Sequence, residues 1–170
     1  YLTLGGLGFY DPSLSAELTR ENYLVQIEQI KAMLHAGRTY QVNLTYRMQG
    51  EIQGDPADMF CGLCEAHIPE YGAMLVYDDL AILSMSPELF FRRDGDIVTC
   101  QPMKGTRPLD GDPEELRGSE KDRAENLMIV DMIRNDLGRI ADTGSVSVPS
   151  LFDVSEHGTV LQMTSTVEAR

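Results

Sequence analysis

The spacing of the apolar residues changes from helical to alternating within the first third of the chain. Over residues 19–37 apolar side chains recur at helical spacing, Glu21 lies in the first turn and a glycine follows the end, which predicts a helix of about four turns. Residues 39–48 then alternate strictly between apolar and polar, which predicts a strand. Its polar face, which includes Asn43, is either solvated or lines a polar cavity. The apolar and aromatic residues within 1–10, with glycines among them, predict one or two further strands.

The middle of the chain combines a helix with a series of short strand-like runs. Asp55 followed by Pro56 marks the start of the helix, and Pro69 stops it. The runs that follow are apolar and bounded by turn residues; they cover 73–77, 80–85, 89–93 and 96–100. Together these runs predict an antiparallel meander.

A second long helix is predicted after a polar stretch. Residues 109–120 are rich in Asp, Glu, Gly and Pro and predict an exposed loop. Ser119 and Asp122 have the spacing of a capping box, and Gly138 is expected to cap the other end of the helix. The apolar side of this helix is expected to consist of Ala124, Leu127, Met128, Met132 and Ile133.

Two more strands complete the predicted sheet. They are expected at 145–148 and 160–167, joined through a polar loop that contains His157. The elements together predict an α+β fold, an antiparallel sheet with the two long helices packed on it. A chain of 170 residues is long enough for one well-cored domain.

Composition and charge exclude several classes of partner. The net charge of −13 repels phosphate backbones and anionic lipid, so we expect no nucleic-acid partner and no membrane partner. No apolar run approaches the ~20 residues that a membrane span needs. Cys61, Cys64 and Cys100 lack a second Cys-x-x-Cys and paired histidines, so they predict packed, reduced thiols in a cytoplasmic protein rather than a zinc site. The surplus of carboxylates favours a divalent cation as the means of holding an anionic ligand.

Two places in the sequence are candidates for chemistry. Lys104 lies in QPMKGTRP, between two prolines and beside Gly105, near the expected end of a strand. A lysine desolvated in a pocket acts as a nucleophile or base, although this stretch taken alone favours the commoner surface lysine in a turn. Asp122 and Glu125 project from one face of the predicted helix, where a solvated charged face is the ordinary explanation.

Four segments of the chain, taken together, resemble the chorismate-utilising enzyme family. These segments are YQVNL at 40–44, SPELF at 86–90, QPMKGTRP at 101–108 and KDRAENLMIVDMIRNDLGR at 121–139. The resemblance implies an anthranilate synthase component I-like fold, and the lysine of PMKGT favours the aminodeoxychorismate branch of the family. Family members are several hundred residues long. Residues 1–170 are therefore expected to be a fragment, roughly half of the chorismate-binding domain, without its N-terminal subdomain and C-terminal portion.

The resemblance implies a reaction and its partners. Chorismate would be aminated to 4-amino-4-deoxychorismate, for para-aminobenzoate and folate, with ammonia from a glutamine amidotransferase subunit or fused domain. Lys104 would attack C2 of chorismate as the C4 hydroxyl leaves, and ammonia would then take C4 and expel the lysine. Isochorismate, salicylate and anthranilate synthases of the same family are alternatives. A non-catalytic binding module is the alternative from another class.

The resemblance also assigns roles to individual residues. Glu88 would pair with Lys104 and move a proton or hold the amine in place. Glu125 would bind Mg²⁺, with Asp122 as a second ligand where relatives usually carry a glutamate. The expected substrate-binding residues are Gly105, Thr106, Asn43 and Gln162. Gln162 stands where many relatives have a histidine, and a glutamine can only hydrogen-bond, so it would not take over an acid-base role.

Overall fold

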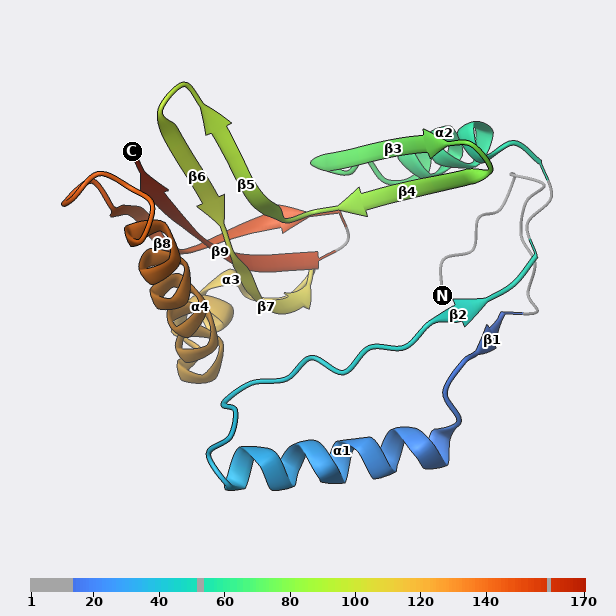
Figure 1. Cartoon of the computed structure of the whole chain (residues 1–170), viewed down its shortest axis with the longest axis horizontal. Helices are drawn as coiled ribbons and strands as arrows, with labels where there is room; N and C mark the ends of the chain where they lie inside the picture. Colours follow the sequence, from blue (N-terminus) through green and yellow to red (C-terminus); the bar gives the residue numbers. More distant parts are fainter. Residues whose placement is uncertain (1–13, 52–53, 159) are drawn as a thin grey trace. The chain divides into compact units, whose positions relative to one another are not determined.

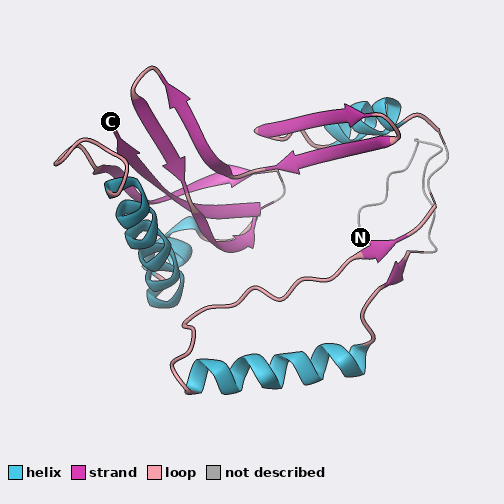
Figure 2. Ribbon diagram, viewed as in Figure 1, coloured by secondary structure: helices cyan, strands magenta, loops and turns pink. Residues whose placement is uncertain are grey.

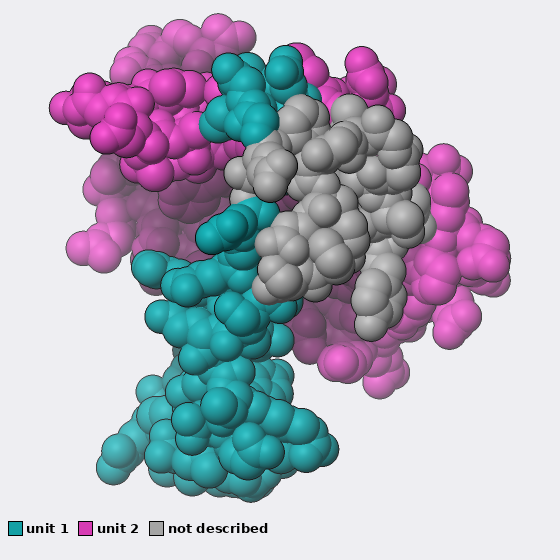
Figure 3. Space-filling model, turned by 90° about the vertical axis from the view of Figure 1, so that its right-hand side faces the viewer, with its two compact units in different colours: residues 1–59 teal, residues 60–170 magenta. Residues whose placement is uncertain are grey.

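The computed structural model describes residues 14–51, 54–158 and 160–170 (Figure 1). The strands predicted within residues 1–10 lie outside this part of the chain. The protein divides into two compact units, Tyr1–Met59 and Phe60–Arg170, which Figure 3 colours separately. None of the helices in the described ranges combines the length and the hydrophobicity that crossing a membrane requires.

The helix predicted for the first unit is confirmed. α1 (Arg20–His35) begins at Thr19, whose hydroxyl accepts a hydrogen bond from the Asn22 backbone N–H at 3.2 Å. Gly37 follows the helix with a φ of +66°, a conformation that favours glycine. No residue of α1 is buried among the described residues.

The strand predicted over residues 39–48 is wrong. Only the end of this segment is in a strand: β2 (Met48–Gln49) pairs antiparallel with β1 (Ser15–Ala16). The alternation of side chains is present, but a strand also needs a neighbouring chain for its backbone hydrogen bonds, and β1 supplies only two paired residues. The apolar side chains of the segment are exposed as a result, including Tyr40, Val42 and Tyr46.

The second unit contains most of the regular structure (Figures 1 and 2). α2 (Pro56–Ala66) begins where the sequence predicted, with Asp55 Oδ1 accepting a hydrogen bond from the Ala57 N–H at 2.7 Å, and it runs across the boundary between the units. The elements that follow are β3 (Tyr71–Tyr77), β4 (Leu80–Ser86), β5 (Leu89–Asp94), β6 (Ile97–Gln101), β7 (Met103–Pro108), α3 (Pro113–Gly118), α4 (Glu120–Gly138), β8 (Ser147–His157) and β9 (Val160–Ala169).

A five-stranded antiparallel sheet is the centre of this unit. β9 pairs with β8 on one edge and with both β6 and β7 on the other, while β5 pairs with β6. β6 and β7 therefore act as one long strand interrupted at Pro102, which has no N–H to donate. The ladder continues across the interruption, because the Ser165 N–H donates to the Pro102 carbonyl at 3.1 Å. The chain does not leave the sheet before Lys104, contrary to the expectation from sequence.

The predicted meander is only partly right. β3 and β4 form the predicted hairpin, and β5 and β6 form another, but β4 and β5 do not pair and belong to different sheets. A hairpin needs a chain reversal, and Pro87 and Glu88 link β4 to β5 without one (Figure 1). The strands therefore divide into a two-stranded ribbon and the five-stranded sheet.

One face of the five-stranded sheet is covered by α3 and α4. Along β9 alternate residues are buried against these helices; they are Leu161, Met163, Ser165, Val167 and Ala169. Leu116 of α3 is fully buried against Leu161 and Met163. The exposed loop predicted at 109–120 is therefore wrong in its second half, where Asp112 caps a helix that has Pro113 in its first turn.

α4 confirms the predicted helix but buries a different side. Ser119 caps it and accepts from the Asp122 N–H at 3.3 Å, as the predicted capping box requires. The buried residues are Asp122, Asn126, Val130 and Leu137, while Leu127 and Met132 of the predicted apolar side are exposed. Hydrophobicity alone misplaced the buried side, because two of its four residues are polar and have partners inside the unit.

The strand predicted at 145–148 is much longer than expected. β8 runs from Ser147 to His157, so His157 ends a strand rather than lying in a loop. Register shifts on both sides of Ser150, and a φ of +62° at Phe152, allow the strand to pass the proline at 149 and follow β9. The α+β class with an antiparallel sheet is confirmed.

Candidate functional site

Lys104 occupies the second position of β7, on the side of the sheet that faces the helices. Its cross-strand partner is Met163, which is fully buried on that side, and directly opposed residues project to the same face. The lysine itself is half-buried. It therefore lies neither in a surface turn nor in the interior, and the next residue carries a bulge that changes the direction of the strand.

Gly105 forms that bulge and lies directly against the helices. Its φ is +79°, a conformation that L side chains rarely adopt. A Cβ at this position would lie 2.9 Å from the Cβ of Asp122 and 2.9 Å from Cδ1 of Leu116. The close approach that the sequence led us to expect toward a ligand is made toward α3 and α4.

Asp122 is a buried carboxylate with fixed partners. Its Oδ2 accepts from Nη2 of Arg107 at 2.8 Å, and the Asp122 side chain is only 10% exposed. Burial pushes the pKa of Asp122 upward, but the hydrogen bonds from Ser119 and Arg107 and the positive charges of Arg107 and Lys121 outweigh it, so the pKa lies below its ordinary value. Asp122 is therefore an anion held between β7 and the first turn of α4.

Glu125 lies one turn further along α4 in a different setting. Its side chain is 38% exposed, and its Oε1 lies 4.0 Å from Nζ of Lys121, so it makes only a loose ion pair. Within residues 14–51, 54–158 and 160–170, no three acidic, histidine or cysteine side chains converge as a metal site. Of the two predicted Mg²⁺ ligands, Glu125 is thus free to take the role, whereas Asp122 is committed to Arg107.

Glu88 lies beside the strand that carries Lys104. Its Oε1 accepts a hydrogen bond from the Met103 backbone N–H at 3.0 Å. This bond gives the first backbone donor of β7 a partner beyond Gln101, where the pairing of β5 with β6 ends. Glu88 therefore lies close to the segment that contains Lys104, as predicted, but the residue that it contacts is Met103. Thr106 and Gln162 also meet, as a cross-strand pair with the amide nitrogen 3.5 Å from the hydroxyl oxygen.

Asn43 is the one predicted site residue that does not belong to the second unit. It lies in the first unit and its side chain is exposed. A pocket of about 390 Å³ in that unit is lined by Leu44 and Tyr46 from the apolar face of the same segment, together with Ala16, Leu18, Arg20 and Tyr23. Among the described residues, this pocket is therefore not lined by the polar face of residues 39–48.

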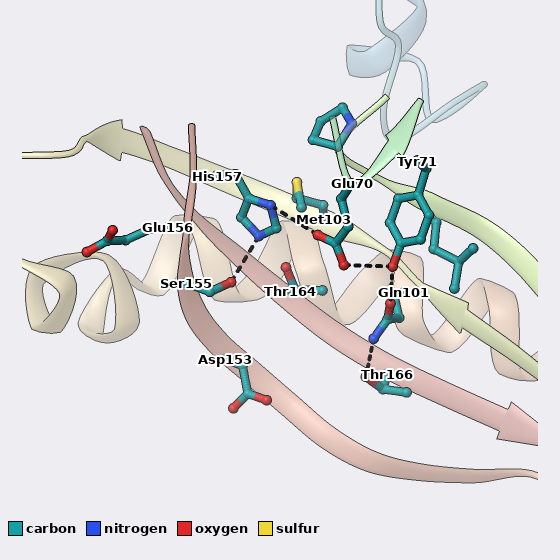
Figure 4. A pocket seen from close by; sticks show the side chains of 12 residues that line it. Glu70, Tyr71, Gln101, Met103, Asp153, Ser155, Glu156, His157, Thr164 and Thr166 are labelled. Carbon is teal, nitrogen blue, oxygen red and sulfur yellow. Dashed lines mark hydrogen bonds and ion pairs between the residues drawn. The ribbon is translucent and has the colours of Figure 1, made fainter. Parts of the chain in front are cut away.

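A polar pocket of about 390 Å³ lies on the other face of the five-stranded sheet (Figure 4). A chain of interactions crosses it: Ser155 Oγ lies 2.9 Å from Nε2 of His157, whose Nδ1 lies 3.5 Å from Oε2 of Glu70. The hydroxyl of Tyr71 donates to the Glu70 or Gln101 side-chain oxygen, at 3.0 and 2.9 Å. The other residues that line the pocket are Pro87, Leu89, Met103, Asp153, Glu156, Thr164 and Thr166.

Sequence reasoning missed this pocket, although one signal was present. In VLQMTSTV the polar residues alternate with buried ones, so Thr164 and Thr166 share the face opposite the helices. The Thr164 hydroxyl is buried and has no hydrogen-bond partner among the described residues. Lys104, Asp122 and Glu125 do not line the pocket, so the predicted site and the pocket are separate features.

Comparison with known proteins gives consistent results. A family described as chorismate binding enzyme matches residues 8–170. Aminodeoxychorismate synthase component 1 from Klebsiella aerogenes is 47% identical over 163 residues, and its Escherichia coli counterpart is 43% identical over 162 residues; each match covers 91% of this chain and 36% of the relative. The chain thus spans about a third of the length of these relatives. Anthranilate synthase component I from Streptococcus pneumoniae superposes with a TM-score of 0.81 at 28% identity, over 92% of this chain and 36% of that one.

Proposed function

The chain belongs to the family of chorismate binding enzymes, and from that premise we propose that the protein aminates chorismate to 4-amino-4-deoxychorismate. The observation that carries the proposal is the 43–47% identity to enzymes named aminodeoxychorismate synthase component 1, together with a lysine at the bulge of β7. Ammonia would come from a glutamine amidotransferase subunit or domain, and the product would serve para-aminobenzoate and folate synthesis. Three free cysteines favour a reducing compartment, and we include the cytoplasm in the proposal.

The proposed reaction proceeds through a covalent amine. The neutral Nζ of Lys104 bonds to C2 of chorismate, the ring double bonds shift, and the C4 hydroxyl leaves with a proton as water. Ammonia then bonds to C4, the double bonds shift back, and the C2–N bond breaks to return the lysine amine. Chorismate and ammonia thus give aminodeoxychorismate and water, and the single substitution is divided into two easier steps.

The residues near Lys104 have separate roles in this proposal. Glu88 reaches the lysine segment through Met103, which suits proton transfer or orientation of the amine. Gly105, Thr106 and Gln162 shape the same end of β7 and β9 and are proposed to line the substrate. We also keep Asn43 in the proposed substrate site, on the resemblance alone.

A metal is part of the proposal only to a limited extent. Mg²⁺ prefers carboxylate oxygens, and Glu125 presents one at the first turns of α4. The described residues do not complete its coordination shell, so further ligands would have to come from elsewhere in the protein. No step of the proposed reaction depends on the ion here.

Incubation of the full-length protein with chorismate, with and without ammonium, tests the proposal. 4-Amino-4-deoxychorismate that forms only when ammonium is present supports it. Isochorismate or salicylate formed without ammonium would overturn it, as would anthranilate, the product indicated by the structural match to an anthranilate synthase component. Binding of chorismate without any product would instead identify a non-catalytic binding module.

Substitution of the proposed nucleophile gives the sharper test. Lys104→Ala in the full-length protein is expected to reduce amination by several orders of magnitude while leaving the melting temperature nearly unchanged, because a half-buried lysine contributes little core volume. Lys31→Ala is the matched control, since Lys31 lies on exposed α1 and its ion pair among the described residues is with Glu28 of the same helix. Turnover by Lys104→Ala equal to that of the control would remove Lys104 from the mechanism.

A further inference from the structure

We infer that Arg107 and Asp122 form a clamp that positions Lys104 and Glu125 relative to one another, and that Asp122 is a positioning residue rather than a metal ligand. The inference rests on the proposed function only in assigning Lys104 and Glu125 to one site. It differs from the sequence-based prediction, which made Asp122 the second ligand of Mg²⁺.

The first argument is that the carboxylate of Asp122 is already occupied. Arg107 donates to it at 2.8 Å, and the side chains of the pair are 31% and 10% exposed for Arg107 and Asp122. A cation that approached this carboxylate would meet the guanidinium charge in a poorly solvated setting, where like charges repel strongly. Mg²⁺ would therefore have to displace Arg107 from a partly buried ion pair.

The second argument is where the pair is anchored. Arg107 belongs to β7 and lies three positions after Lys104, while Asp122 belongs to the first turn of α4. The Cβ of Asp122 sits against Gly105, the bulged residue, at a distance that leaves no room for a side chain there. The ion pair and the contact at Gly105 therefore both join β7 to α4, close to the bulge that sets the direction of Lys104.

The third argument concerns Glu125. On a helix, residues three positions apart share a face, so the first turn of α4 fixes where Glu125 projects. That turn is held at Asp122 from two directions, by Arg107 through its carboxylate and by Ser119, which accepts from its N–H. Loss of the clamp would shift the helix start and the lysine strand against each other, without removing either functional group.

A double-mutant cycle in the full-length protein tests the clamp. The variants are Arg107→Gln, Asp122→Asn and the combination, with Arg117→Gln as control because Arg117 is an exposed arginine that pairs with Glu114 within α3. We expect Arg107→Gln to lower the melting temperature more than the control does, because it leaves a buried carboxylate unpaired, and the double variant to recover part of the loss. Strictly additive changes in melting temperature would overturn the clamp.

Metal binding and kinetics separate positioning from ligation. Calorimetric titration with Mg²⁺, with and without chorismate, should give Asp122→Asn and Arg107→Gln the same affinity within about threefold, because both variants break the same clamp, whereas loss of a ligand would weaken binding by about tenfold or more in Asp122→Asn alone. Arg107→Gln should lower kcat with little change in the KM for chorismate. Asp122→Asn that weakens Mg²⁺ binding by about tenfold, while Arg107→Gln leaves it intact, would make Asp122 a ligand and overturn the inference.

The two proposals fail in different ways. Non-additive changes in melting temperature across the Arg107 and Asp122 variants, in a protein that makes no aminodeoxychorismate, would refute the proposed function and leave the clamp in place. Additive melting temperatures in an active enzyme would do the reverse.

Discussion

Asp122 and Glu125 show how neighbouring carboxylates of similar chemistry acquire different properties. Both lie at the start of α4, but Asp122 is buried and bonded to Arg107, whereas Glu125 is partly exposed and only loosely paired. Desolvation and direct charge partners decide which carboxylate is fixed and which is free to bind something else. The resemblance identified both residues, but it could not distinguish these two environments.

The lowered pKa of Asp122 gives a prediction about stability and pH. A carboxyl whose pKa is lower in the folded protein than in the unfolded chain contributes stability above the unfolded pKa, which is 3.8 for Asp, and loses it as pH falls through the lower folded pKa. The difference in melting temperature between wild type and Asp122→Asn should therefore be constant from about pH 5 to 8 and shrink below about pH 4. Calorimetry of the full-length protein across this range measures it. Asp131→Asn, at an exposed ion pair, should show little difference at any pH, and a gap that widens in acid for Asp122→Asn would contradict the prediction.

The cysteines should differ sharply in reactivity. Burial raises the pKa of the Cys100 thiol and leaves the residue 7% exposed, whereas Cys61 is exposed on α2. Iodoacetamide at pH 8 should therefore label Cys61 readily and Cys100 only after unfolding, with the sites read by mass spectrometry. Equal labelling of Cys61 and Cys100 in the folded protein would show that β6 is more accessible than its packing indicates.

At the scale of elements, features set by neighbouring residues were predicted correctly, whereas features that depend on tertiary contacts were not. The caps of α1 and α4 and the turns of both hairpins are short-range features, so the sequence contains what determines them. The segment 39–48 failed as a strand because pairing depends on a partner far away in the sequence. The buried side of α4 was predicted wrongly because Asn126 is polar and yet buried. Its Oδ1 accepts a hydrogen bond from the Ser165 hydroxyl at 2.5 Å, which offsets the cost of burial. No pattern local to the helix reveals that partner.

The site was predictable to a similar extent. The segment around Lys104 and the pair of acidic residues on α4 were found from the sequence and its resemblance, and the structure brings Gly105 against Asp122. The pocket around Glu70 and His157 was missed, since its lining comes from elements that only the tertiary fold brings together.

The packing of α3 and α4 predicts how two leucines will respond to truncation. Leu116 is fully buried against β9, so Leu116→Ala in the full-length protein is expected to lower the free energy of unfolding by about 2–5 kcal/mol. Leu127 is 50% exposed on α4, so Leu127→Ala is expected to cost less than about 1 kcal/mol. Chemical denaturation of both variants measures the difference. Equal losses would mean that Leu127 is buried by another part of the protein, and a negligible loss for Leu116 would contradict the packing of α3.

At the scale of the whole molecule, the 170 residues leave much apolar surface uncovered. Leu75 and Ile82 lie opposite each other on the β3–β4 ribbon and are 60% and 49% exposed, and Phe90 on β5 is 84% exposed. Neighbouring exposed apolar side chains, such as Leu75 and Ile82, mark a contact region. The curated relatives are nearly three times as long as the matched segment, which is consistent with further packing in proteins of that length.

The exposed ribbon predicts that the 170-residue chain on its own will associate with itself. Sedimentation velocity over a concentration series should show species larger than 18.9 kDa that increase with concentration. Leu75→Thr combined with Ile82→Thr replaces the opposed apolar pair with a polar β-branched residue that suits a strand, and it should shift the distribution toward monomer. A monomer at all concentrations would show that this surface does not drive association.

The contacts of the 170-residue chain also predict that on its own it will not bind its proposed ligands. Glu125 is the only one of the two expected metal carboxylates that is not committed to an arginine, and Mg²⁺ dehydrates reluctantly, so one carboxylate holds it weakly. Chorismate carries two carboxylates, and a chain of net charge −13 repels it unless bound cations or placed arginines compensate. Lys104 and Glu88 are present, yet the proposed substrate-lining residues Gly105, Thr106 and Gln162 carry no charge to hold a dianion, so the proposed nucleophile gains little from proximity. Calorimetric titration of the chain with Mg²⁺ and chorismate should therefore detect no binding under conditions where the full-length protein binds both, and micromolar affinity would place more of the site within these residues than their contacts indicate.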